Sequence, residues 1–142
     1  MQSPGKLITN DLLFIKMTDN YTSRFDQYAH EYQTWGRMLE FYKQESAFLK
    51  TRLSKVVDSG IDKKSLVLAE HFQNQFIIRD DFIIELRRDI NAMGAAIKGD
   101  SNAAIMKYDA KQNKLRSEIS YLEKSFSQLK DEFNKYLLSI VK

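Results

Sequence analysis

Residues 21–56 read YTSRFDQYAHEYQTWGRMLEFYKQESAFLKTRLSKV, and large apolar side chains recur along this stretch in alternating steps of four and three. Such spacing is the heptad pattern of a helix that buries one stripe of side chains, here called its seam, against neighbouring helices. Ser46 alone interrupts the seam with a polar residue. The apolar seam residues are Tyr21, Phe25, Tyr28, Tyr32, Trp35, Leu39, Tyr42, Leu49, Leu53 and Val56. The stretch therefore predicts one long helix whose aromatic side chains lie in a core.

Two further stretches, 69–97 and 105–140, repeat the same steps, each with one basic or amide residue at a seam position, Arg79 and Gln112. Gly60 and Gly99 follow the first two stretches and suit the left-handed residue that ends many helices. Short connections make consecutive helices antiparallel neighbours. We therefore expect an all-α, coiled-coil-like, up-down-up antiparallel three-helix bundle over residues 19–142, with helices at about 20–58, 62–98 and 101–141.

Residues 1–18 break the heptad pattern, since Pro4 and Gly5 precede an irregular apolar run. The apolar residues there are Leu7, Ile8, Leu12, Leu13, Phe14, Ile15 and Met17. Two arrangements remain open for this segment. It forms a small extra helix, capped by Asn10 or Asp11, that folds back on the bundle, or it is an arm that docks onto another chain.

Composition restricts the class of protein. The 142 residues fit one domain, and the absence of Cys excludes disulfides and thiolate sites. Because 22 basic residues nearly balance 19 acidic ones, the net charge of +3 does not point to a nucleic-acid partner. No apolar run approaches the roughly 20 residues of a membrane span, so we expect no membrane insertion and a cytoplasmic location.

Catalytic chemistry finds little support in the sequence. The two histidines, His30 and His71, fall on outward faces of their helices, without the spacing of a helical metal site. No phosphate loop or nucleophile motif is present. A basic stretch on the third helix has acids beside it, which favours a solvated face; its residues are Lys107, Lys111, Lys114 and Arg116. We expect no catalytic residues, no metal, no cofactor and no enzyme activity.

Arg79 is the most unusual seam residue because it carries a charge. Counting through the two connections places Arg79 near Glu45 of the first helix and Glu118 of the third. One hypothesis is a partly buried ion pair that fixes the helix register at some cost in stability. The alternative is that the Arg79 side chain simply reaches solvent.

Apolar residues outside the seams predict an interaction surface. Phe41 and Phe48 are seven residues apart, as are Ile77 and Ile84, and the count places both pairs near the middle of one side of the bundle. Met38, Ile78 and Phe82 are expected close by. Three occupants of this apolar face remain open: the N-terminal segment of the same chain, a second copy, or a different partner.

These features favour a non-enzymatic helical interaction or scaffold protein that binds a protein partner or itself, in the latter case as a homo-oligomer, most simply a dimer. The alternative is a regulatory protein that binds a small molecule or nucleic acid. Such a regulator would use the Tyr- and Trp-rich end of the bundle or the basic stretch of the third helix.

Overall fold

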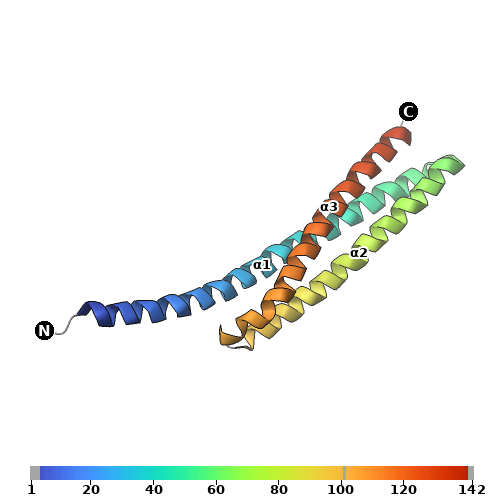
Figure 1. The fold of residues 1–142 in the computed structure, drawn as a ribbon. Coiled ribbons are helices and arrows are strands. Elements are labelled where there is room, and N and C mark those ends of the chain that lie inside the picture. The colour runs from blue at the N-terminus through green and yellow to red at the C-terminus, as the bar shows by residue number, and fades with distance from the viewer. Residues whose placement is uncertain (1–3, 101, 141–142) are drawn as a thin grey trace.

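The computed structural model describes the backbone of residues 4–100 and 102–140, and the side chains of residues 24–100 and 105–140. Three long helices pack as an up-down-up antiparallel bundle, which confirms the expected all-α fold (Figure 1). They are α1 (Pro4–Asp58), α2 (Lys63–Lys98) and α3 (Asp109–Ile140), with a short 3-10 helix, η1 (Asn102–Tyr108), between α2 and α3. Among the three long helices, contacts are most extensive between α1 and α2 and fewest between α1 and α3.

Helix α1 is far longer than expected. It begins at Pro4, not near residue 20, and continues unbroken for 55 residues through Asn10 and Asp11, so no separate capped helix forms there. Pro4 suits the first turn of a helix, and no other proline follows it. In Figure 1 the N-terminal part of α1 runs past the junction of α2 and η1, away from the other helices, and it does not fold back on the bundle. Residues 4–23 are called the N-terminal arm below.

The connection between α1 and α2 follows the sequence prediction. Gly60 has φ +83°, the left-handed conformation that L side chains rarely adopt. Asp62 caps α2, because its carboxylate accepts a 2.7 Å hydrogen bond from the backbone N–H of Ser65. The reversal is therefore tight, and α2 returns along α1.

The second connection differs from the expectation. Gly99 has φ −87°, so the left-handed conformation predicted there is wrong. The chain instead passes through the 3-10 turns of η1 before α3 begins at Asp109. The carboxylate of Asp100 accepts a 2.6 Å hydrogen bond from the hydroxyl of Tyr108 and pairs with Lys107 at 2.5 Å. These contacts connect Asp100, which precedes η1, to the C-terminal end of η1. The sequence also allows Asp100 or Ser101 to cap the third helix, and Ser101 lies outside the described residues.

The core consists of two apolar clusters along the bundle. One surrounds Leu39, Leu86 and Leu122, and the other surrounds Phe76, Phe126 and Phe133. Tyr42 packs against both clusters. Ser46, fully buried on α1, and Arg79, partly buried on α2, lie between the clusters, whereas on α3 the clusters adjoin at Leu122 and Phe126.

Near the C-terminal end of α2, a large residue of α1 lies beside a small residue of α2. A Cβ atom added to Gly94 would meet the Tyr32 ring at 3.8 Å, which is ordinary van der Waals contact. Tyr28, Tyr32 and Trp35 are all buried, so this part of the aromatic stripe belongs to the core.

Candidate interaction surface

The polar residues of the seams do not form the expected ion pair. Arg79 donates to Gln75 of its own helix at 2.9 Å, while its Nε atom is buried without a hydrogen-bond partner. Glu45 pairs with Lys130 and Glu118 with Lys114. Glu45 lies on the flank of α1 that faces α3, whereas the partner of Glu118 is a residue of its own helix, four positions earlier. The Arg79–Glu45–Glu118 contact is therefore absent among the described residues.

A different polar network connects α1 to α3. Arg116 donates two hydrogen bonds to the Glu31 carboxylate, each 2.6 Å long, and Gln112 donates to the same carboxylate at 3.3 Å. The buried amide of Gln112 also accepts a hydrogen bond from the hydroxyl of Tyr32. The Arg116 guanidinium holds the pKa of Glu31 below its ordinary value, and burial raises the pKa of Tyr32. Gln112 is thus satisfied inside the seam, as a buried amide must be.

Asp109, one turn before Gln112 on α3, extends this polar network. Its carboxylate accepts hydrogen bonds from the hydroxyl of Tyr28 and from the guanidinium of Arg24. The Tyr28 hydrogen bond, followed by Arg24, lowers the pKa of Asp109. Sequence reasoning missed these polar contacts between α1 and α3, which involve Tyr28, Glu31, Asp109 and Arg116. The available signal was the acids and bases that recur beside the seams of the two helices.

Ion pairs show which flank of each helix faces which neighbour. On one side, Lys50 pairs with Asp80 at 2.5 Å and Glu40 with Arg87 at 2.9 Å, across α1 and α2. On the other side of α1, Glu45 pairs with Lys130 of α3. Residues three or four positions from these acids and bases share their flank, because such residues are neighbours on a helix surface.

Ile77 and Ile84 lie on the α1–α2 face. Ile77 is three residues before Asp80, and Ile84 lies between Asp80 and Arg87, both of which pair with α1. Their side chains are 44% and 56% exposed, too much for core residues. Ile84 also lines a groove between the two helices, here called the lower groove; the other lining residues are Lys43, Ala47, Lys50, Asp80, Ile83 and Arg87.

Phe41 and Phe48 lie on a different face from the isoleucines. They stand four residues before and three residues after Glu45, so they share the flank of α1 that faces α3. Both rings are more than half exposed, and the Arg52 guanidinium lies 5.9 Å from the Phe48 ring centroid. The phenylalanine pair and the isoleucine pair lie at similar positions along the bundle axis but point to different sides of the bundle. The single apolar side expected from the sequence is therefore divided between two faces.

The remaining residues of the expected surface are also dispersed. Phe82 is partly buried, and its ring meets the Tyr121 ring of α3 at 6.0 Å between centroids. Ile78, one turn before Phe82, is exposed on the same α3 side of α2. Met38 packs against the core. Only Ile77 and Ile84 of the seven belong to the α1–α2 face.

A second groove lies further along the α1–α2 face, here called the upper groove. Small exposed residues, Ala29 of α1 and Ala95 of α2, line it together with Gly94. Ala29 and Lys43 are two heptads apart, as are Gln33 and Ala47, so both grooves follow one face. A Cβ atom added to Gly36, which lies between them on α1, would meet nothing within 4 Å. The α1–α2 face thus has two separate grooves, with the Glu40–Arg87 pair between them.

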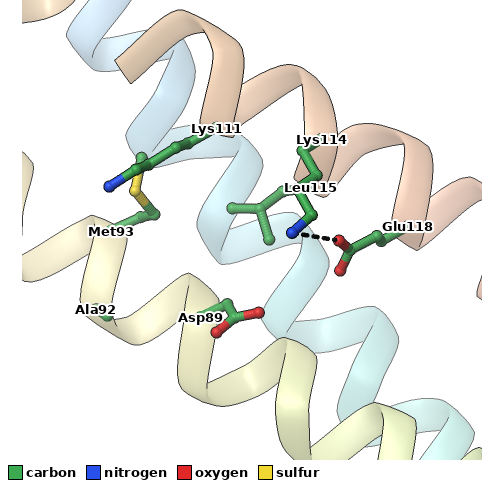
Figure 2. A pocket seen from close by; sticks show the side chains of 7 residues that line it. All are labelled: Asp89, Ala92, Met93, Lys111, Lys114, Leu115 and Glu118. Carbon is green, nitrogen blue, oxygen red and sulfur yellow. Dashed lines mark ion pairs between the residues drawn. The ribbon is translucent and has the colours of Figure 1, made fainter. Parts of the chain in front are cut away.

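A third groove lies between α2 and α3 (Figure 2). Lys111 and Lys114 reach into it from α3, and the acids Asp89 and Glu118 line it as well. Lys114 pairs with Glu118 at 3.7 Å. The basic stretch of α3 is divided among separate contacts, since Lys107 pairs with Asp100 and Arg116 with Glu31. Mixed charge makes this groove a weak site for a polyanion.

The described side chains, 24–100 and 105–140, contain no group of three or more His, Asp or Glu residues that would hold a metal ion. His30 and His71 are exposed. In the described part of the chain, no helix combines the length and the apolar character needed to cross a membrane. No protein-family model, curated protein or solved structure shows significant similarity to this chain.

Proposed function

We propose that this chain is a non-enzymatic helical interaction protein that assembles by taking a further helix, supplied by a second copy, against its α1–α2 face. The observation that carries this proposal is that the exposed Ile84 lines one of two grooves on that face, with the exposed Ile77 one heptad away on the same flank of α2. Bundles of four helices bury such a face in their core.

The chemistry of the face supports an apolar helix as its ligand. Ala47, Ile83 and Ile84 supply the apolar lining of the lower groove, and the acids beside it are already paired with Lys50 and Arg87. Pairing of these charges lowers the cost of removing water from the surroundings of the groove. Lys43, at the rim, would remain available to an acidic residue of the incoming helix.

The alternative, a regulator that binds a small molecule or nucleic acid, has less support. The groove beside the basic stretch of α3 holds Asp89 and Glu118 among its lysines, and Tyr32 and Trp35 at the aromatic end are buried in the core. A cytoplasmic location remains part of our proposal, and cell fractionation would test it.

Substitution of the exposed isoleucines tests the proposal. Ile77→Asp with Ile84→Asp should preserve helicity, because both side chains lie outside the core, and should weaken self-association at least tenfold in sedimentation equilibrium. A matched control is Val67→Asp with Leu138→Asp, which changes two residues that are 61% and 75% exposed away from the grooves. Equal association of both double variants and the unmodified chain would refute the proposal.

A further inference from the structure

The N-terminal arm is an apolar helical segment that extends beyond the three-helix bundle. About 20 residues at 1.5 Å each make a helix about 30 Å long. An isolated helix of this length is marginal in water, and most helix stability in proteins comes from packing an apolar face. The arm sequence is rich in Leu, Ile and Phe, yet its backbone lies apart from α2, η1 and α3 (Figure 1).

The α1–α2 face has the matching length. From the first α1 residue of the upper groove, Ala29, to the last of the lower groove, Lys50, the face spans 22 residues by number, or about 33 Å of helix, with the Glu40–Arg87 pair between the grooves. The upper groove opens close to the point where the arm leaves the bundle. The Tyr28 and Arg24 contacts to Asp109 are on the flank of α1 that faces α3, so they leave the α1–α2 face free at this end.

A two-fold arrangement brings these parts together. If two copies meet with their α1 helices antiparallel and the axis near the start of the upper groove, each arm runs along the α1–α2 face of the other copy. Both arms are then covered at once, as a two-fold interface requires. Contact between the two isoleucine pairs alone would bury little surface compared with the roughly 800 Å² per partner of a stable complex. Exchange of two helices about 30 Å long supplies far more.

From this geometry we infer that residues 4–23 of one copy occupy the grooves of the α1–α2 face of a second copy, and reciprocally. The inference rests on the proposed function, because it names the helix that the face receives. Residues Ala29, Gly94 and Ala95 allow the incoming helix to approach closely, since their side chains are small. The exposed Ile77 and Ile84 contact its far end.

Paramagnetic broadening tests which helix occupies the face. The chain has no native Cys, so Asn10→Cys accepts a single nitroxide in the arm of an otherwise unchanged protein. This chain is co-refolded with an equal amount of ¹⁵N-labelled, nitroxide-free protein. We expect broadening of the labelled amides of Lys43, Ala47 and Ile84. A nitroxide at Ala110→Cys, on the exposed side of α3, is the control and should leave these amides sharp.

Broadening confined to residues 4–23 would mean that the arms pair with each other, and this result would overturn the inference. Absence of intermolecular broadening would overturn it as well. Either result leaves the proposed function standing as long as the Ile77→Asp, Ile84→Asp variant still loses association. The two ideas therefore fail separately.

Obstruction of the upper groove gives a second readout. Ala29→Arg with Ala95→Arg should weaken dimerisation at least tenfold, because the new side chains fill the space where the arm approaches. Ala92→Arg with Ala110→Arg adds the same charge to exposed positions of α2 and α3 outside this groove. Dimerisation that is equally strong in both variants would contradict the inference.

Discussion

Arg116 on α3 and Glu31 on α1 form a bidentate pair, in which Nε and Nη2 each donate a 2.6 Å hydrogen bond to a separate carboxylate oxygen. This pair connects the two helices that share the fewest direct contacts in the bundle. Planar, two-point pairing fixes both rotation and register. Polar contacts therefore contribute more to the position of α3 relative to α1 than to the position of α2 relative to α1.

Removal of the Glu31 charge should destabilise the bundle. Glu31→Gln retains the shape but loses the charge-assisted hydrogen bonds, and because Arg116 is about one-third exposed we expect a loss of only about 1 kcal/mol in the free energy of unfolding. Urea denaturation at pH 7 measures this loss. Glu123→Gln, at an exposed position of α3, is the control and should change the free energy little. Equal effects of the two substitutions would contradict the role given to the pair.

Acid should remove the difference between Glu31→Gln and the unmodified chain. The folded-state pKa of Glu31 is lowered, mainly by Arg116, so its stabilisation is complete above the unfolded value of about 4.3 and is lost as the pH falls through the folded value. The free-energy difference between the two proteins should thus be constant from pH 7 to 5 and shrink below that range. A difference that grows on acidification would have the wrong sign.

Ser46 is expected to cost stability. Its hydroxyl is fully buried and has no hydrogen-bond partner among the described residues. Ser46→Ala should raise the free energy of unfolding by about 1 kcal/mol more than Ser54→Ala, an exposed control on the same helix that shares the gain in helix propensity. A smaller gain at Ser46 than at Ser54 would show that the hydroxyl is satisfied.

Two glycines should respond in opposite directions to alanine. Gly36 lies inside α1 with open space around its added Cβ, so Gly36→Ala should stabilise by about 0.5–1 kcal/mol. Gly60 has φ +83°, and Gly60→Ala should destabilise by about 1 kcal/mol. Thermal melts of both variants, each made in the Ile77→Asp, Ile84→Asp background so that no second copy covers Gly36, test this contrast, and stabilisation by both would contradict the left-handed turn at Gly60.

Helix identity and topology were predictable because the alternating apolar steps, and the short turn at Gly60 and Asp62, specify antiparallel neighbours. The length of α1 was not predictable from the same signal. Residues 4–20 lose the regular steps, yet between Gly5 and Gly36 the sequence has no proline or glycine, and the helix continues. Gly99 was misassigned because a glycine after a helix does not by itself require the left-handed conformation.

Heptad counting did not predict the partner of Glu45 or the separation of the two apolar pairs, and the reason is geometric. In an up-down-up bundle the third helix can lie on either side of the first two, and heptad counting does not decide between these arrangements. The choice determines which flank of α1 faces α3, and hence that Glu45 meets Lys130 and not Arg79. It also places Phe41 and Phe48 on one face and Ile77 and Ile84 on another. The position of these side chains along the bundle axis was predictable, whereas the side of the bundle that they face was not.

The central claim is that the α1–α2 face is covered by a second copy. Its most direct test is the absolute mass in solution, measured by light scattering on a sizing column over a tenfold range of protein concentration. We predict twice the 16.7 kDa mass of the chain at the upper end of the range, and a lower mass for the Ile77→Asp, Ile84→Asp variant at the same concentration. A mass of 16.7 kDa for the unmodified chain at every concentration would contradict the claim.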